Sequence, residues 1–165
     1  MNLFKKMYCR IFQTMFYIAM PILPYREPQI FNDVTKLLVF LREKNIRRAL
    51  LVTDETLRSL DVTKKLEDAA AKELIALTVY DKTVPNPTSD NVEESRILYL
   101  QNNCQAIIGF GGGSAIDCAK AVGARIARPK KSLKKMKGIL KIIKKTPPII
   151  AIPTDRKSTR LNSSH

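Results

Sequence analysis

The sequence predicts an α/β fold, in which a mostly parallel sheet is flanked by helices. Short apolar runs of strand length alternate along the chain with longer stretches whose apolar residues recur at helical spacing. The connections are short, and the runs are apolar along their whole length, as in parallel strands covered on both faces. The expected strands are residues 49–53, 75–80, 104–110 and 149–152.

Helices are expected around these strands, at residues 30–41, 63–73, 91–102 and 114–127. Asn32 or Asp33 is the expected cap of the first helix, because short polar side chains bind the free N–H groups there. Asp90 opens the third helix and places Glu93 and Glu94 in its first turn, where the helix dipole favours acids. Strand and helix therefore alternate through most of the chain.

A glycine-rich turn joins the third strand to the fourth helix. Gly111, Gly112 and Gly113 precede Ser114, so no Cβ keeps a ligand from the backbone there. A helix N-terminus offers unpaired N–H groups and the positive end of a dipole, which together bind phosphate. The spacing matches neither Gly-x-Gly-x-x-Gly nor a Gly-Lys-Ser/Thr loop. The alternatives are a phosphate site or a plain tight turn, with Ser114 either capping the helix or donating to phosphate.

Three further polar residues stand near the expected carboxyl edge of the sheet, where ligands of α/β folds bind. Asp54 ends the first strand; it either caps a helix or accepts from ribose hydroxyls, and its charge would repel a 2′-phosphate. Asn86 lies between Pro85 and Pro87 after the second strand and binds either a ligand or its own backbone. Asp117 lies in the first turn of the fourth helix and either stabilises the dipole or faces the ligand.

The net charge of +14 comes largely from one block of the chain. Residues 120–154 hold 11 of the 29 Lys and Arg residues and no acid. No aromatic residue lies among the lysines of 130–145, so the block lacks a stacking platform for bases, and no nucleic acid is expected as a partner. The block is interpreted as a solvated basic face. The alternative of another class is a non-catalytic module that binds anions, nucleic acid or a membrane surface.

The two ends of the chain differ from its middle. Residues 1–24 are expected to form an amphipathic helix or extension, too short and polar for a transmembrane span and without a signal-peptide cleavage site; contact with a membrane surface is the minority interpretation. Residues 25–154 are the expected domain. Residues 155–165 resemble the translation of a sequencing-library adapter, so the gene is hypothesised to continue beyond Thr154. A genomic clone that encodes this tail before a genuine stop codon would contradict the hypothesis.

The cysteines bear on the compartment. Cys9, Cys104 and Cys118 are an odd, sparse set without the spacing of a metal site or a disulfide framework. Such a set suits a reducing compartment, so a cytoplasmic location is expected.

Taken together, the motifs resemble those of the iron-containing (group III) alcohol dehydrogenases over residues 31–154. In chain order they are Val84-Pro85-Asn86-Pro87-Thr88, then Asn91-Val92 with Glu94, then Ile108 to Lys120, and finally Pro148 to Thr154. The resemblance implies a Rossmann-like nucleotide-binding domain, similar to the N-terminal domain of dehydroquinate synthases. It also implies a helical metal-binding domain, which is missing from this chain.

The resemblance also implies an activity and a set of binding residues. The activity is reversible oxidation of a primary or other small alcohol to its aldehyde with NAD or NADP and Fe²⁺ or another divalent metal, in a homodimer or higher homo-oligomer. By position, the residues that match the family's cofactor site are Gly111, Gly112, Gly113, Ser114 and Asp117 at the pyrophosphate loop, Asp54 near the adenosine ribose, Asn86 in the second loop and Thr154 at the start of a Thr-Thr-Ala-Gly-Thr segment. The charge of Asp54 favours NAD over NADP as the expected cofactor.

The chain departs from the family in three places. Asp155-Arg156 follows Thr154 where the family has another Thr and a glycine-containing loop. The family's metal ligands, one Asp and three His, lie further downstream, and the single histidine here is His165 in the tail. No catalytic residue and no metal ligand is therefore expected, nor turnover by this chain alone. Asp61 and Leu74 occupy positions where related chains often have glycine, and we interpret them as tolerated changes. The alternative within the fold is a glycerol-dehydrogenase-like or dehydroquinate-synthase-like enzyme.

Overall fold

The computed structural model describes residues 7, 10, 14, 15, 29–132 and 146–154. The chain divides into two units, Met1–Ile30 and Phe31–His165, and the fold below is that of the second unit. Most of the expected N-terminal helix, the basic segment 133–145 and the tail 155–165 lie outside the described residues. Within the described residues, no helix is both long enough and apolar enough to cross a membrane.

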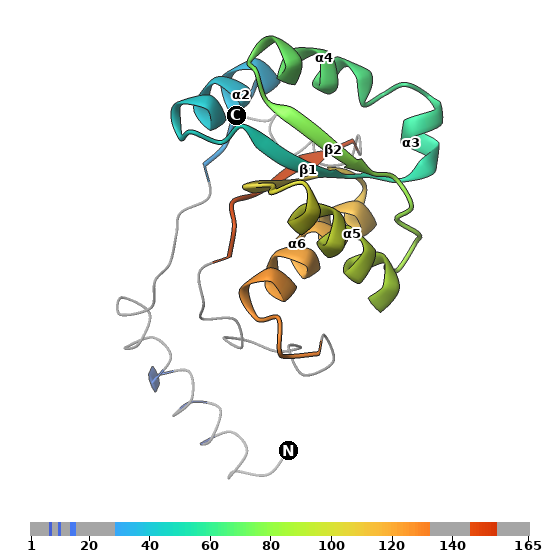
Figure 1. The fold of residues 1–165 in the computed structure, drawn as a ribbon. Helices are drawn as coiled ribbons and strands as arrows, with labels where there is room; N and C mark the ends of the chain where they lie inside the picture. Colours follow the sequence, from blue (N-terminus) through green and yellow to red (C-terminus); the bar gives the residue numbers. More distant parts are fainter. Residues whose placement is uncertain (1–6, 8–9, 11–13, 16–28, 133–145, 155–165) are drawn as a thin grey trace, which may run out of the picture. The chain divides into compact units, whose positions relative to one another are not determined.

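A parallel sheet of four strands forms the centre of the second unit (Figure 1). Its strands are β1 (Arg48–Val52), β2 (Ala76–Tyr80), β3 (Ala106–Gly111) and β4 (Ile149–Pro153). Their order across the sheet is β2-β1-β3-β4, and each neighbouring pair is parallel. The α/β fold with a parallel sheet and its strands is thus confirmed, with the bounds shifted by one or two residues.

Helices cover both faces of this sheet. Alternate residues of each strand point to opposite faces, so both faces carry apolar side chains that the helices bury. Ala49 and Leu51 of β1 belong to one apolar cluster, and Leu50 and Val52 belong to the other. Figure 1 shows the first face covered by helices that lie above the sheet, and the second face covered by helices below it. The upper layer is α2 (Val34–Glu43), α3 (Glu55–Ser59) and α4 (Lys64–Lys72), and the lower layer is α5 (Ser89–Gln101) and α6 (Gly113–Ala127).

The four helices expected around the strands are all present, but details of the prediction were wrong. Helix α3 was not expected. It has only five residues and none of them is buried, so no apolar periodicity indicated it. Thr88, rather than Asp90, caps α5 through a capping box with Asn91. Because the helix therefore begins earlier, Asp90 is the acid of its first turn, and Glu93 lies one turn further on.

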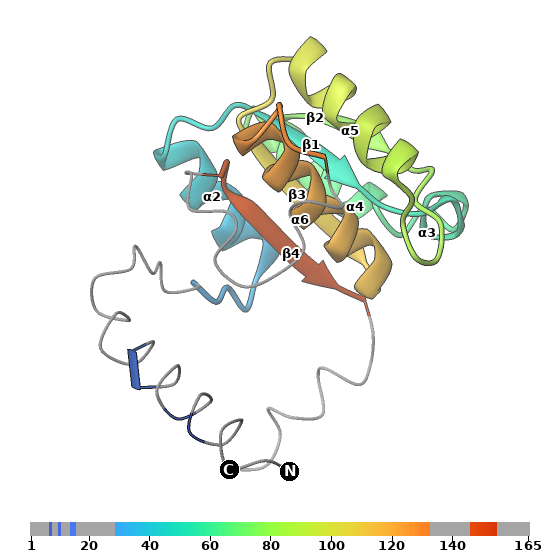
Figure 2. The same cartoon turned by 90° about the horizontal axis from the view of Figure 1, so that it is seen from below.

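Glu93 instead joins the two helices of the lower layer. Its carboxylate accepts from Arg125 of α6, and its Oε2 lies 2.7 Å from Nε of Arg96. The hydrogen bond from Arg125 outweighs the effect of burial and lowers the pKa of Glu93. Figure 2 shows β4 in red running alongside α6, so this helix is held by α5 on one side and by the sheet on the other.

The chain leaves several helices through a left-handed residue that is not glycine. After α4, Ile75 N–H donates to the carbonyl of Ala70 and Leu74 N–H to that of Ala71, which is the Schellman pattern. Leu74 has φ 58°, and Asp61 has φ 53° in the same arrangement after α3. In the left-handed region the Cβ of an L-residue is crowded, and glycine has no Cβ. Glycine would therefore relieve backbone strain at Asp61 and Leu74.

Replacing Leu74 with glycine is expected to raise the free energy of unfolding by about 0.5 to 1 kcal/mol. The relief of the left-handed strain exceeds the added entropy of the unfolded chain. Little packing is lost, because Leu74 is 76% exposed. Urea unfolding measures the change. The matched control is Leu100→Gly, an exposed leucine inside α5, which is expected to lose about 1 kcal/mol. Destabilisation by both changes would contradict the strain at Leu74.

Candidate functional site

The carboxyl ends of the four strands meet at one edge of the sheet, since all strands are parallel. Asp54 lies shortly beyond β1, Gly111 ends β3, and Thr154 follows β4. Thr154 donates its backbone N–H to the carbonyl of Gly111 at 3.2 Å. A Cβ built on Gly111 would lie 3.5 Å from Oδ2 of Asp54. Three of the predicted site residues, far apart in sequence, are therefore neighbours at this edge.

Gly111 is required by the protein itself. Its φ of 138° is rarely adopted by residues with a side chain, and a Cβ there would come within 2.9 Å of Cδ1 of Leu57 in α3. The tight passage between β3 and α6 therefore needs a glycine for reasons of backbone and packing. This position says nothing by itself about a ligand.

Gly112 and Gly113 differ from Gly111 in this respect. Gly112 has φ −75° and ψ −173°, which any residue adopts, and Gly113 is the first residue of α6. A Cβ on either would meet no atom within 4 Å. Neither the backbone nor the packing of the described residues thus requires glycine here. Two bare glycines at the start of a helix leave its N-terminal N–H groups open to approach.

The N-terminus of α6 carries no side-chain cap. Gly112 is the N-cap residue, so of the two roles that the sequence left open for Ser114, capping the helix is excluded. The first hydrogen bond of the helix runs from Ile116 N–H to the carbonyl of Gly112. The N–H groups of Gly113, Ser114 and Ala115 precede it and, as at any helix start, have no partner within the helix. This end of α6 therefore presents a group of donors and the positive end of a dipole.

Asp117 is the fifth residue of α6, so the prediction that it lies in the first turn was wrong, and it lies on the solvent side of the helix. Its side chain is 69% exposed, and its Oδ1 lies 3.2 Å from Nζ of Lys120 on the next turn. Such an exposed ion pair contributes little to stability, so it fixes the carboxylate only weakly.

Asp54 serves the fold and faces the glycine turn at the same time. Its Oδ1 accepts from the N–H of Leu57 at 2.9 Å, which makes it the N-cap of α3. Capping was one of the two roles that the sequence left open. The second carboxylate oxygen, Oδ2, is the one near Gly111. One oxygen of Asp54 thus holds α3, while the other faces the carboxyl edge of the sheet.

Asn86 stands at the tip of the loop between β2 and α5. It is exposed and has φ 57°, a left-handed conformation that Asn tolerates better than most residues. No hydrogen bond of its side chain is found in the described part of the chain. The loop is instead held by Asn91, which was not among the site residues expected from the sequence. The Thr-x-x-Asn spacing of Thr88 and Asn91 was the available signal.

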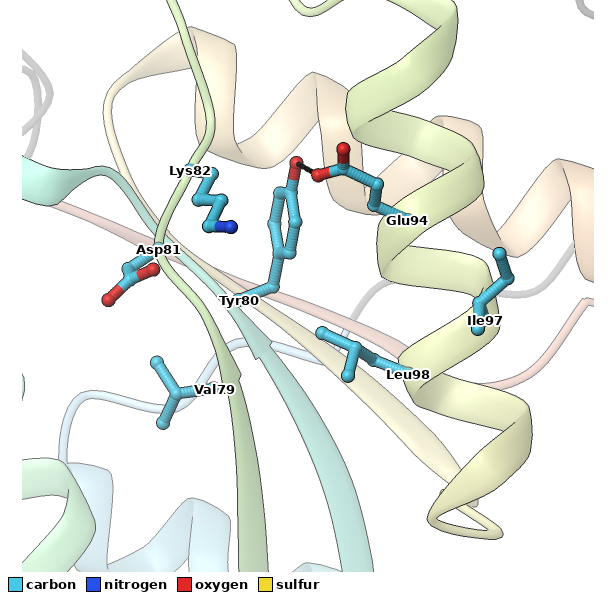
Figure 3. Close-up of a pocket in the computed structure, with 7 residues that line it drawn as sticks. All are labelled: Val79, Tyr80, Asp81, Lys82, Glu94, Ile97 and Leu98. Carbon is cyan, nitrogen blue, oxygen red and sulfur yellow. Dashed lines mark hydrogen bonds between the residues drawn. The ribbon is translucent and has the colours of Figure 1, made fainter.

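A separate hollow of about 300 Å³ lies beside the edge strand β2 and α5 (Figure 3). It lies at the carboxyl end of β2, and none of the predicted site residues lines it. Tyr80 stands in its wall and donates its hydroxyl to Oε2 of Glu94 at 2.9 Å. Burial raises the pKa of Tyr80 to about 12, so the phenol stays protonated. The lining residues are Val79, Tyr80, Asp81, Lys82, Glu94, Ile97 and Leu98.

The described residues hold no group of three or more His, Cys, Asp or Glu side chains placed to bind a metal ion. Cys104 and Cys118 are buried thiols, and burial raises the pKa of both. Protonated, buried thiols are poor nucleophiles and poor metal ligands.

The parallel sheet, with a glycine turn leading into an uncapped helix at its carboxyl edge, defines an α/β protein of the Rossmann-like class. The family model of the iron-containing alcohol dehydrogenases matches residues 29–155. The chain therefore belongs to the iron-containing alcohol dehydrogenase family.

Individual relatives agree with this assignment. Lactaldehyde reductase of Escherichia coli K12 is 33% identical over 115 residues, which are 69% of this chain and 30% of that protein. The NAD-dependent methanol dehydrogenase of Bacillus methanolicus is 29% identical over 114 residues, 69% of this chain and 30% of that protein. The chain thus spans about 30% of the length of these curated relatives.

Solved structures show the same fold. A 1,3-propanediol oxidoreductase has a TM-score of 0.69 and 28% identity, covering 74% of this chain and 32% of its own. An alcohol dehydrogenase from Oenococcus oeni has a TM-score of 0.69 and 27% identity, covering 73% of this chain and 32% of its own. The similarity therefore concerns about a third of each of these larger proteins.

Proposed function

We propose that this chain is the NAD(P)-binding portion of an iron-dependent alcohol dehydrogenase. The observation that carries the proposal is the pair Gly112 and Gly113. Nothing in the described protein requires glycine at these positions, yet both stand where a pyrophosphate would approach the N-terminus of α6. Glycine is a common N-cap, which accounts for Gly112 in part, but alanine would form the helix better at Gly113, so a ligand is the simplest reason for glycine there.

Each of the other predicted residues has a role in this proposal. The pyrophosphate accepts from the N–H groups at the start of α6, with Ser114 as a further donor. Oδ2 of Asp54 accepts from a hydroxyl of the adenosine ribose and disfavours a 2′-phosphate. Asn86 contacts the cofactor from the loop after β2, while Asp117 and Thr154 flank the glycine turn. When bound, the nicotinamide supplies the acceptor or donor of the hydride, and the chain binds and orients it.

The whole enzyme of this proposal oxidises a primary or other small alcohol, or reduces the aldehyde. The described residues offer no site that fits Fe²⁺ or another divalent metal, so we assign no metal-dependent step to them. We propose that this chain has no turnover alone. From its family and its sparse cysteines we propose separately that the whole enzyme is a cytoplasmic homo-oligomer. Oxidation of propanediol or butanol by the purified chain with added iron would contradict the first of these statements.

Substitution of Asp54 by serine tests the dinucleotide site. Serine keeps an N-cap for α3 but removes the charge, so the preference for NADH over NADPH is expected to shrink by about tenfold. Titration of each cofactor by fluorescence or calorimetry gives both affinities. The control is Asp81→Ser, because Asp81 is an acid that directly follows β2 near the same edge.

Three outcomes of this test are distinct. A wild-type chain that binds neither dinucleotide overturns the proposed function. If the wild-type chain binds NADH but Asp54→Ser keeps the same preference for NADH over NADPH, only the proposed contact of Asp54 with the ribose is contradicted. If Asp54→Ser and Asp81→Ser change the cofactor preference equally, its cause is the negative charge of the sheet edge as a whole rather than contact with Asp54.

A further inference from the structure

The side chain of Asn91 holds both ends of the loop that carries Asn86. Its Nδ2 donates to the carbonyl of Lys82 at 3.0 Å, at the start of the loop. Its Oδ1 accepts from the N–H of Thr88 at 3.1 Å, at the end of the loop. A single carboxamide thus closes the five-residue segment 83–87 across its base. The two prolines within this segment stiffen it, so fixing its ends fixes its tip.

The same side chain is tied to the edge of the sheet. Nδ2 of Asn91 also donates to the hydroxyl of Tyr80 at 3.0 Å, and that hydroxyl donates to Glu94. Tyr80 is the last residue of β2 and is only 3% exposed, so it provides a rigid anchor. Figure 3 shows the Tyr80 ring beside α5, with its hydroxyl towards Glu94. Asn91 therefore sets the loop relative to both β2 and α5.

This set of partners requires a carboxamide. Asn91 has two N–H donors, which the Lys82 carbonyl and the Tyr80 hydroxyl use, and its oxygen accepts from Thr88. An aspartate of the same shape would still accept from Thr88. Its other oxygen would, however, face the carbonyl of Lys82 without a proton between them. The loop would then lose its hold at the Lys82 end, and two acceptors would repel each other.

We propose that Asn91 is a positioning residue for the dinucleotide, which presents Asn86 to the cofactor by clamping the loop at both ends. This inference rests on the proposed function, and it adds a residue that does not itself touch the cofactor. A looser loop presents Asn86 less often in the binding geometry, so the affinity falls although every contacting residue is intact.

The test compares Asn91→Asp with Asn102→Asp. Asn102 lies at the other end of α5, where its Nδ2 donates to the carbonyl of Leu98 at 2.9 Å, so its loss weakens the same helix without touching the loop. Calorimetric titration with NAD⁺ at pH 8 is expected to show about tenfold weaker binding for Asn91→Asp and unchanged binding for Asn102→Asp.

The pH dependence separates positioning from general destabilisation. In Asn91→Asp, protonation of the introduced carboxylate restores a donor for the Lys82 carbonyl, so the affinity ratio of wild type to this variant is expected to shrink towards one as the pH falls through the ordinary aspartate pKa of about 4. Glu94 and Tyr80 lie beside this side chain, and they and Asp54 are the same in both proteins, so the ratio isolates the introduced carboxylate. A ratio of one at pH 8, or a loss shared by Asn102→Asp, would overturn the inference.

A measurement without ligand keeps the inference separate from the proposed function. Hydrogen exchange is expected to quicken at the amides of Thr83 and Thr88 in Asn91→Ala, and not in Asn102→Ala. Thr88 donates to Asn91 directly, and Thr83 donates to the carbonyl of Thr53 from the start of the clamped segment. Unchanged exchange would show that Asn91 clamps nothing. A wild-type chain that binds no NAD⁺ removes the cofactor role, and the exchange data still decide the clamp.

Discussion

The substitution Gly113→Ala is expected to weaken NADH binding by at least about tenfold, while the folded chain stays as stable or becomes up to about 1 kcal/mol more stable. A Cβ at this position meets no protein atom within 4 Å, and alanine forms helices better than glycine. The proposed pyrophosphate, however, needs that space to reach the N–H groups of α6. A blocked hydrogen bond to a charged group loses about 1.5 to 3 kcal/mol.

Gly123 of the same helix provides the matched control. A Cβ there would lie 2.7 Å from Cδ1 of Ile149, on the side of α6 that faces β4 and away from the glycine turn. Gly123→Ala is therefore expected to change the free energy of unfolding but not the affinity for NADH. Fluorescence titration and urea unfolding of the two variants give both quantities. A Gly113→Ala variant that binds NADH as tightly as the wild type would contradict a pyrophosphate at this turn.

The strands were predictable because each is a short apolar run bounded by polar residues. Leu50, Leu51 and Val52 are completely buried, as the lack of alternation in their polarity indicated. Helix α3 was not predictable in the same way. None of its residues is buried, and Asp54 alone indicates a helix cap but not the helix that follows. The cap of α5 was misplaced for a different reason. Thr88 and Asp90 are both good caps, and the reciprocal bonds with Asn91 decide between them.

The sequence predicted the members of the candidate site but not their relation to one another. Asp54 and Gly111 are brought together by the register of β1 and β3, in which Val52 pairs with Gly109, and Leu57 of α3 packs against the glycine turn beside them. The difference between Gly111, which the protein needs, and Gly113, which it does not, depends on φ and on neighbours from other elements. Asn91 entered the prediction only as part of a family motif, because its role depends on hydrogen bonds to both ends of the loop and to Tyr80 of β2. The capping box of Thr88 and Asn91 has a local pattern, but the bonds to Lys82 and Tyr80 are tertiary and have none.

The position of α6 on the sheet depends on Gly109 of β3. A Cβ built there would lie 3.0 Å from Cα of Ile116, 3.0 Å from Cβ of Ala119 and 3.3 Å from the carbonyl oxygen of Ala115. Two of these atoms belong to the backbone of α6, which cannot turn aside as a side chain does. Gly109→Ala is therefore expected to push the helix from the sheet and to lower the free energy of unfolding by about 3 kcal/mol.

The comparison with Gly123→Ala decides what causes this loss. The contact at Gly123 is closer, at 2.7 Å, but it is made by the end methyl group of Ile149, which can rotate away. If backbone rigidity governs the cost, urea unfolding will show the larger loss for Gly109→Ala despite its longer contact distances. The same displacement moves the N-terminus of α6, so NADH affinity is expected to fall in Gly109→Ala even where the variant remains folded. A larger loss of stability for Gly123→Ala would mean that the shortest contact, rather than the stiffness of its partner, sets the cost of an added methyl group between α6 and the sheet.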